Sequence, residues 1–281
     1  MPAPLSKKVT LSDLRAARAS GAKLAMLTCY DYSIARLMQE AGVPMLLVGD
    51  SAANVILGHE TTIPVPLEFM IELTAAVRRG APLAFVVADM PFGSYASFES
   101  GVQNVCRIVK LSCCDCVKIE VAPSHAALVR ACADAGVAVM AHIGLRPQTV
   151  NLLGGYKYQG RTAEQAGAIV ALALEMQQAG AAAILLEAVP PEVSQRVVER
   201  TGIPVIGCGA GPACHGAVVV THDAIGLSAH RPPRFVPKIG DAAAVLKEMF
   251  AKYVNNLESG AYPAPEHQYE MPPEERAKFL R

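Results

Sequence analysis

The sequence predicts an α/β protein that folds as a (βα)8 TIM barrel. Three observations support this prediction: the chain has 281 residues, it contains eight strand-like apolar runs, and most of these runs are separated by segments with helical apolar spacing. Barrels of this kind commonly take about 250 residues. We therefore assign residues 1–281 to a single barrel domain with a short N-terminal helix and a C-terminal tail.

The elements are expected to alternate along the chain. Residues 13–19 predict a short helix before the first strand, and residues 241–257 predict a long helix after the last. Segment 209–217 is too short and too rich in Gly for a full helix, and the stretch from Tyr262, rich in Pro and Glu, is typical of a tail that packs outside or frays. The strands are expected near residues 24–30, 45–50, 83–89, 116–121, 137–143, 182–188, 204–208 and 218–222.

The charge balance argues against several classes of partner. Lys plus Arg and Asp plus Glu number 25 each, so the sequence lacks the basic excess expected of a protein that binds nucleic acid or anionic membranes. The N-terminus lacks the apolar core of a signal peptide, and no apolar stretch approaches the roughly 20 residues of a transmembrane helix. We expect a cytoplasmic protein whose partner is a small molecule.

Cysteines are frequent but have no paired spacing. The eight residues lie in apolar segments, and only Cys113, Cys114 and Cys116 are clustered. A zinc site would need a second Cys or His pair nearby. Small buried thiols in a reducing compartment are the favoured interpretation.

Five of the apolar runs end in a carboxylate or a histidine: Asp50, Asp89, Glu120, His142 and Glu187. Polar groups at the ends of buried strands are costly unless they converge on something. The carboxyl ends of all strands in a parallel barrel meet at one mouth, where active sites of this fold lie. We therefore predict one site shared by several strands.

Period-two alternation assigns the charged residues of the fourth strand to the inside. Lys118 and Glu120 share one face, and Val117 and Ile119 share the other. Lys118 fits either a Schiff-base nucleophile or a cationic grip on a substrate carboxylate, and the nearby Glu120 favours the charged, gripping form.

Asp50, Asp89 and Glu120 together predict a magnesium site, because they offer hard oxygen ligands without thiolates. The alternative for each acid is a helix cap or an ion pair with arginine. Glu187, alone at the tip of an apolar strand, is the candidate general base, with a buried salt bridge as the alternative. His142 fits a donor to a substrate oxygen or a structural core histidine.

A long non-periodic loop, residues 144–160, follows His142 directly. Its Gly-rich, aromatic-bearing sequence and its position favour a lid over the mouth rather than a plain connection. Metal, cation and base together suit enolisation of a 2-oxo acid, although these residues do not identify the electrophile.

Several segments, taken in order, resemble the ketopantoate hydroxymethyltransferase family over about residues 10–266. The matching segments are VGDS at 48–51, VRRGAP at 77–82, VKIE at 117–120, AHIGL at 141–145, PQTVNLLGGYKYQGR at 147–161 and PVIGCGAG at 204–211. The resemblance implies a barrel of the phosphoenolpyruvate/pyruvate type. It also implies transfer of a hydroxymethyl group from 5,10-methylenetetrahydrofolate to 3-methyl-2-oxobutanoate with Mg²⁺, forming 2-dehydropantoate for pantothenate and coenzyme A synthesis, in a homodecamer.

The resemblance also assigns roles to residues of the matching motifs. Asp50 and Asp89 would hold magnesium, with Glu120 nearby through water, and Glu187 would accept the proton. The residues that would contact the oxo acid are Asp50, Ser51, Asp89, Lys118 and His142. Tyr156 and Arg161 would belong to the lid.

Some positions depart from the pattern usual in that family. Ala53 and Val121 stand where glycine is common, Ser112 and Cys113 stand where Gly-Ala is common, and His215 stands where an acid is usual. A Cβ added at a tight turn can shift the ligand beside it. Three alternatives therefore stay open: a divergent paralogue with weak activity, a Mg²⁺-dependent carbon–carbon lyase or mutase of the same barrel group, and a non-catalytic barrel that binds an oxo acid.

Overall fold

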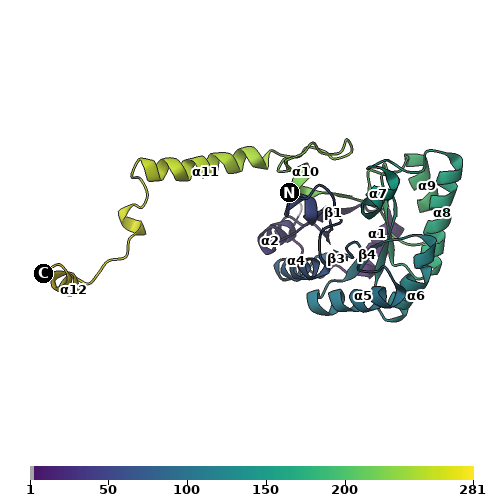
Figure 1. Ribbon diagram of the computed structural model, residues 1–281, viewed down its shortest axis with the longest axis horizontal. Helices are drawn as coiled ribbons and strands as arrows, with labels where there is room; N and C mark the ends of the chain where they lie inside the picture. The colour runs from purple at the N-terminus through teal and green to yellow at the C-terminus, as the bar shows by residue number, and fades with distance from the viewer. Residues whose placement is uncertain (1–2) are drawn as a thin grey trace. The chain divides into compact units, whose positions relative to one another are not determined.

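The computed structural model describes residues 3–281 and contains the predicted closed barrel. Its eight strands are all parallel and pair in sequence order, and β8 pairs with β1 to close the sheet. Figure 1 shows the strands with helices around them. The strands are β1 (Leu24–Thr28), β2 (Met45–Val48), β3 (Phe85–Asp89), β4 (Cys116–Glu120), β5 (Val139–Gly144), β6 (Ala183–Glu187), β7 (Val205–Cys208) and β8 (Gly216–Val219).

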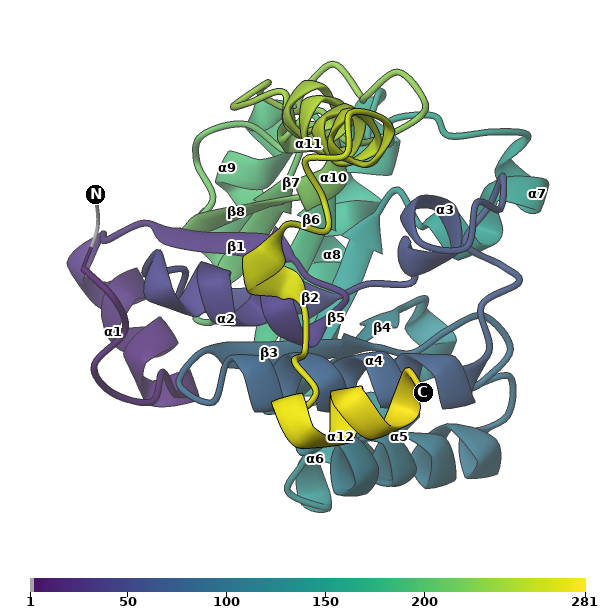
Figure 2. The same cartoon turned by 90° about the vertical axis from the view of Figure 1, so that its left-hand side faces the viewer.

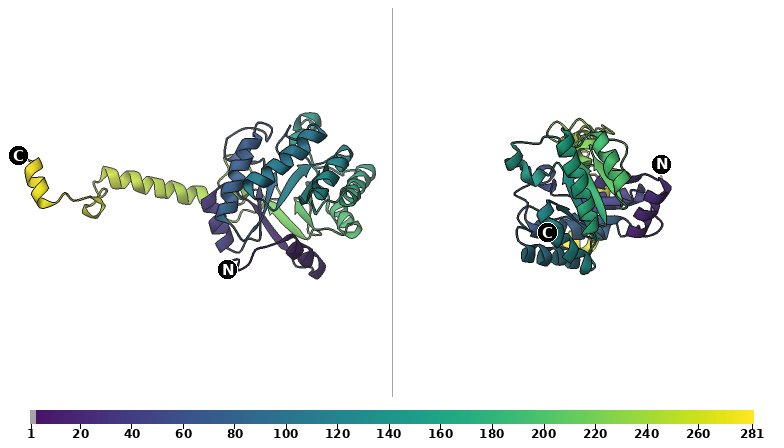
Figure 3. Two further views of the ribbon diagram at one scale, coloured as in Figure 1. Left: turned by 90° about the horizontal axis from the view of Figure 1, so that it is seen from below. Right: turned by 90° about the vertical axis from the view of Figure 1, so that its right-hand side faces the viewer.

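Helices follow most of the strands, as the sequence predicts. Among the described residues no helix separates β7 from β8, which confirms the interpretation of segment 209–217. Figure 3 shows the helical layer from two further directions. The helices are α1 (Leu11–Ser20), α2 (Tyr32–Glu40), α3 (Ala52–Val55), α4 (Leu67–Gly80), α5 (Phe98–Ser112), α6 (Ala126–Asp134), α7 (Val150–Leu153), α8 (Ala163–Gln178), α9 (Pro191–Arg200), α10 (Thr221–Ala224), α11 (Ala242–Glu258) and α12 (Pro273–Phe279), with 3-10 turns η1 (Pro123–His125), η2 (Pro147–Thr149) and η3 (Pro265–His267).

The last strand begins earlier than expected. It spans Gly216–Val219 instead of residues 218–222, so it also ends earlier. The end is set by Thr221, the first residue of α10, which is hydrogen-bonded to β1. The Thr221 backbone N–H donates to the Thr28 hydroxyl at 2.9 Å, and the Thr221 hydroxyl donates to the Thr28 carbonyl. This side-chain pairing, which strand periodicity does not reveal, ends the strand.

Two apolar clusters divide the barrel into an inside and an outside. The inner cluster includes Met26, Met45, Phe85 and Leu185, and Leu14 of α1 belongs to it. Helix α1 begins with a capping box in which Thr10 and Asp13 satisfy each other's backbone N–H groups. In Figure 2, α1 lies at one end of the strands, and α3 and α7 lie at the other. The amino end is therefore closed by packing, and the mouth is at the carboxyl end.

The chain divides into two compact units. The first comprises residues 1–224 and 228–237, and the second comprises residues 225–227 and 238–281. The second unit contains the predicted final helix, found at α11, and the predicted tail, in which α12 forms a further helix. Whether this unit belongs to one barrel domain with the first stays a prediction. No helix among the described residues is long and apolar enough to cross a bilayer.

The thiols are less uniformly buried than expected. Cys106 and Cys113 are exposed and Cys208 is partly exposed, whereas the remaining five are buried. Cys113 ends α5 in the left-handed conformation with φ of 56°, and this places its side chain outside the core.

Candidate active site

Strand alternation points the predicted residues into the barrel. On β4, Val117 and Ile119 pack in the outer cluster with the helices, whereas Cys116 packs in the inner cluster. Lys118 and Glu120 share the face of Cys116 and are both about 3% exposed. The predicted inward direction of the two charges is therefore confirmed.

Asp89 lies at the centre of an acidic side of the mouth. Its Oδ2 accepts a hydrogen bond from the Asp50 backbone N–H at 3.0 Å, and its Oδ1 lies 2.8 Å from the Lys118 ammonium. The Lys118 ammonium is the polar group in contact with Oδ1 among the described residues. A carboxylate oxygen has two lone pairs, so Oδ1 can also bind a further cation.

Gln148, which the sequence analysis missed, lies between two of the acids. Its side-chain amide donates to Asp50 Oδ2 at 2.9 Å, and its backbone N–H lies 3.3 and 3.2 Å from the two carboxylate oxygens of Glu120. The only signal in the sequence is its place in the matching segment just after the histidine strand. A glutamine in a loop has no periodicity that would mark it as buried.

Ser51 has a partner that the sequence analysis also missed. Its hydroxyl lies 2.8 Å from the hydroxyl of Tyr30, which follows β1 and is only 3% exposed. Burial raises the pKa of Tyr30, so the tyrosine hydroxyl stays protonated at neutral pH. Ser51 is thereby held at the mouth beside Asp50.

His142 and Glu187 form a second side of the mouth. His142 Nδ1 lies 3.1 Å from the Lys118 ammonium, and Nε2 lies 3.3 Å from Glu187 Oε2. An ammonium can only donate, so Nδ1 accepts and Nε2 carries the ring proton. Nε2 has no hydrogen-bond partner in the described residues, and it is therefore free to donate to a ligand oxygen.

The protonation states differ between groups for physical reasons. Burial raises the pKa of Glu187 to about 7, although the Lys118 charge opposes this shift. Burial, and then the charge of Lys118, lower the pKa of His142 well below its usual value. At neutral pH the imidazole is therefore neutral, and Glu187 is close to half ionised, as suits a general base.

The acids beside Lys118 are also shifted. Burial raises the pKa of Asp89 to about 7 and that of Glu120 well above its usual value, with Lys118 opposing both shifts. Burial alone would lower the pKa of Lys118, but the charges of Asp89, Asp50 and Glu120 raise it above its ordinary value. Lys118 is therefore a permanent cation, which favours the gripping role over a Schiff-base nucleophile.

The donor set fits a divalent cation held by few protein ligands. Four carboxyl groups, those of Asp50, Asp89, Glu120 and Glu187, share the mouth with one ammonium, that of Lys118, so a bound dication would favour their ionised forms and offset most of the excess negative charge. Among the described residues no three acidic, His or Cys side chains converge closely enough to hold one ion. Magnesium usually binds one or two carboxylates and completes its shell with water and substrate oxygens, which agrees with this arrangement.

The predicted lid begins beside Glu187. Gly144 has φ of 93°, and a Cβ there would lie 2.3 Å from the Glu187 carbonyl oxygen, so only glycine fits. That carbonyl accepts the Leu145 N–H at 2.9 Å, and the Gln159 N–H donates to the carbonyl of Ala188 at 2.9 Å. Both ends of loop 144–160 are thus attached next to the candidate base.

Tyr156 and Arg161 lie in this loop region. Tyr156 is 51% exposed; its partial burial raises the pKa of its hydroxyl, and the charges of Asp50, Glu120 and Glu187 add to the shift. The Arg161 guanidinium instead lies 5.0 Å from the centre of the Tyr158 ring. A lid role for both residues stays a prediction.

Of the departures from the family pattern, Cys113 alone has a positive φ, and it lies at the end of α5. Among the described residues the other non-glycine residue with positive φ is Ala188, so Ala53 and Val121 adopt ordinary conformations. His215 precedes β8, where its Nδ1 accepts the Val205 N–H and its carbonyl accepts the Leu24 N–H. These contacts are at the amino ends of the strands, opposite the mouth.

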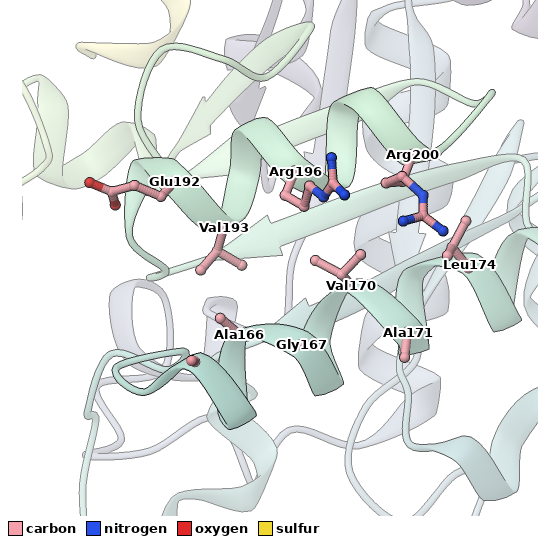
Figure 4. A pocket seen from close by; sticks show the side chains of 10 residues that line it. Ala166, Gly167, Val170, Ala171, Leu174, Glu192, Val193, Arg196 and Arg200 are labelled. Atoms are coloured by element: carbon pink, nitrogen blue, oxygen red, sulfur yellow. The ribbon is translucent and has the colours of Figure 1, made fainter.

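A hollow on the outside of the barrel is separate from this site. It lies between α8 and α9 and is lined by residues that include Ala166, Val170, Val193 and Arg196 (Figure 4). None of the residues that line it belongs to the mouth.

Solved structures with the same fold come from barrel enzymes. A phosphonopyruvate hydrolase, in a complex with oxalate and Mg²⁺, is similar with a TM-score of 0.63 at 15% identity, over 96% of this chain and 98% of that one. A 2,3-dimethylmalate lyase, described as a member of the PEP mutase/isocitrate lyase superfamily, is similar with a TM-score of 0.58 at 17% identity, over 94% and 92% of the two chains. The predicted (βα)8 TIM barrel is thereby confirmed. The mouth lies at the carboxyl ends of the strands, where active sites of this fold are found.

Sequence relatives identify the family. A 3-methyl-2-oxobutanoate hydroxymethyltransferase of Rhodococcus jostii (strain RHA1) is 42% identical over 264 residues, 94% of this chain and 91% of the relative. One of Chloroflexus aggregans (strain MD-66 / DSM 9485) is 43% identical over 277 residues, 97% and 98% of the two chains. A family model described as Ketopantoate hydroxymethyltransferase matches residues 8–265. The chain belongs to the ketopantoate hydroxymethyltransferase family.

Proposed function

We propose that this protein transfers a hydroxymethyl group from 5,10-methylenetetrahydrofolate to 3-methyl-2-oxobutanoate in the cytoplasm, forming 2-dehydropantoate for pantothenate synthesis. The observation that carries the proposal is the pairing of Glu187, a carboxylate with a pKa of about 7, with a separate acidic side that contains Asp50, Asp89 and Lys118. A base apart from the cation-binding groups is what enolisation of an oxo acid requires.

The acidic side would hold the oxo acid and Mg²⁺. Asp50 and Asp89 would hold the ion, with Glu120 nearby through water, and the Lys118 ammonium would attract the substrate carboxylate. Ser51, fixed by Tyr30, would donate to a substrate oxygen. When bound, the ion would stabilise the negative charge that develops on the substrate's keto oxygen.

The base side would move the proton. The Glu187 carboxylate would remove the C3 proton of the oxo acid. The neutral His142, with its proton on Nε2 and lying 3.3 Å from Glu187, would donate to a substrate oxygen. The resulting carbanion equivalent at C3 would attack the methylene carbon of the folate as the first of its two carbon–nitrogen bonds opens, and the proton held by Glu187 would pass to the freed nitrogen. Water would then displace the second nitrogen from that carbon, leaving its hydroxyl on the product and its other proton on the nitrogen, and tetrahydrofolate would leave.

Loop 144–160 would cover the mouth during this chemistry. Its two ends are hydrogen-bonded to the carbonyls of Glu187 and Ala188, so closure of the loop and placement of the base are linked. Tyr156 and Arg161 would belong to the closed lid, which would exclude water from the carbanion equivalent.

Assembly into a homodecamer is part of this proposal. Helix α11 supports association, because it has no buried residue and carries large exposed apolar side chains, among them Met249, Phe250 and Tyr253. Sedimentation velocity would test it. A species of one chain at micromolar concentration would contradict the assembly.

A turnover assay tests the function directly. The protein is incubated with 3-methyl-2-oxobutanoate and 5,10-methylenetetrahydrofolate, with Mg²⁺ or with a chelator, and 2-dehydropantoate is measured. We expect product only with Mg²⁺. Loss of the folate dependence, or cleavage of a 2-methylisocitrate-like acid instead, would favour the lyase alternative.

A further inference from the structure

Gln148 connects more parts of the mouth than any of the predicted residues. It is 5% exposed, and its amide Nε2 donates to Asp50 Oδ2 and to the Met90 carbonyl, both at 2.9 Å. Asp50 follows β2 and Met90 follows β3, so one amide group spans the carboxyl ends of two strands. Both hydrogens of the amide are thereby used.

Tyr95 fixes the orientation of this amide. Its hydroxyl donates to Gln148 Oε1 at 2.6 Å. A flipped amide would direct Oε1 at the Asp50 carboxylate and the Met90 carbonyl, where it would meet only acceptors. Burial, and then the charge of Glu120, raise the pKa of Tyr95, so its hydroxyl remains a donor at neutral pH.

The backbone of Gln148 holds a second carboxylate. Its N–H lies 3.3 and 3.2 Å from the two oxygens of Glu120, within η2 at the beginning of loop 144–160. Glu120 and Asp50 therefore depend on one residue, through its main chain and its side chain respectively. The same contacts attach the loop to the strand ends.

We propose that Gln148, oriented by Tyr95, is a positioning residue that aims Asp50 and Glu120 at a divalent cation and couples the order of loop 144–160 to cation binding. The inference rests on the proposed function, because it assumes a cation at these carboxylates. Hydrogen-bond partners behind metal ligands commonly change metal affinity by about 10- to 100-fold when they are removed. By linkage, a loop whose order strengthens cation binding must itself be ordered by the cation.

Isothermal titration calorimetry with Mg²⁺ tests the positioning role in the full-length protein. Gln148→Met keeps the length of the side chain but removes the amide, and we expect about 10-fold weaker binding. Tyr95→Phe removes only the hydrogen bond that orients the Gln148 amide, so a smaller loss of affinity for Mg²⁺ is expected. Gln195→Met is the control for the same substitution: Gln195 is exposed on α9, its amide donates to Glu199, and the affinity for Mg²⁺ should be unchanged.

Hydrogen–deuterium exchange of loop 144–160 tests the coupling. Mg²⁺ should slow the exchange of loop peptides in the parent and in Gln195→Met. At the same Mg²⁺ concentration, the slowing should be smaller in Gln148→Met. At saturating Mg²⁺, C3 proton exchange of the oxo acid by Gln148→Met should recover toward the parent rate, because the contacts of Glu187 are intact. A catalytic role for Gln148 would leave that rate low and would contradict a positioning role.

The outcomes separate this inference from the proposed function. If the parent binds Mg²⁺ and both Gln148→Met and Tyr95→Phe bind it equally well, the positioning role is wrong while the function stands. If the parent binds no Mg²⁺, both are wrong. Should circular dichroism show that Gln148→Met does not fold, Tyr95→Phe decides, and an unchanged affinity in that variant overturns the inference.

Discussion

The two sides of the barrel mouth are built differently. On the acidic side, Asp50 and Glu120 accept hydrogen bonds from Gln148, and Asp89 pairs with Lys118. On the base side, Glu187 lies 3.3 Å from a neutral histidine and has no hydrogen-bond donor of good geometry among the described residues. A carboxylate that holds charge needs fixed donors, whereas one that moves a proton needs a pKa near neutrality. The comparison shows how one barrel gives chemically similar side chains different environments.

The largest effect should follow from removing the base. We expect Glu187→Gln to slow Mg²⁺-dependent C3 proton exchange of 3-methyl-2-oxobutanoate by about 10²- to 10⁴-fold, while Mg²⁺ and the oxo acid still bind. Deuterium exchange followed by NMR measures the rate. Glu192→Gln, an exposed acid on α9, is the control. A parent-like rate in Glu187→Gln would show that the base lies elsewhere.

On the acidic side, a substitution at Lys118 should lower the free energy of unfolding. Lys118→Met leaves the buried Asp89 without its cation, and removing one partner of a buried pair commonly costs about 3–5 kcal/mol. Urea unfolding without Mg²⁺ measures the loss. The double variant with Asp89→Asn should recover much of it, and Lys110→Met, at an exposed position, should have little effect. Additive losses in the double variant would contradict the pairing.

The pH dependence of stability should distinguish the base side. Burial raises the pKa of Glu187 from 4.5 to about 7, so its protonated form stabilises the fold at low pH, and this contribution is lost as the pH rises through about 7. Glu187→Gln removes this loss of stability at high pH. The free energy of unfolding of the variant should therefore exceed that of the parent by at most about 3 kcal/mol at pH 8, and the difference at pH 5 should be small. Urea unfolding of both proteins at pH 8 and at pH 5 measures this difference. The contributions of the other acids cancel, because both proteins contain them. If the difference in the free energy of unfolding does not increase between pH 5 and pH 8, the pKa of the Glu187 carboxyl is not raised by the fold.

The smallest effect concerns the backbone next to the base. Ala188 has φ of 48°, which costs an L residue about 1–2 kcal/mol. Ala188→Gly should relieve this strain and raise the free energy of unfolding by up to about 1 kcal/mol. Ala171→Gly, at an exposed position inside α8, should lower it by a similar amount. Thermal unfolding shows whether each variant is more or less stable than the parent. A loss of stability in Ala188→Gly would mean that packing of the Ala188 methyl group outweighs the strain.

Sequence patterns predicted most of the fold and many of the site's residues. Eight strands, the short helix α1 and the long helix α11 follow from periodicity, because the pattern of buried side chains is written directly into the chain. The strand-end position of Asp89, His142 and Glu187 predicted that they would meet, since parallel strands in a barrel end at one mouth. The predicted end of β8 was wrong by a few residues, because hydrogen bonds between Thr28 of β1 and Thr221 of α10 end the strand earlier.

By itself, the sequence determined the class of fold and the inward direction of the strand-end charges, since both depend on short-range periodicity. Only the tertiary structure decided that Gln148, Tyr95 and Tyr30 belong to the mouth, and that His142 is neutral while Lys118 is charged. Hydrogen bonds between loops and shifts of pKa depend on which groups surround a side chain in space. That environment is assembled from segments as distant as Asp50 and Gln148, whose contact has no signature in the local sequence.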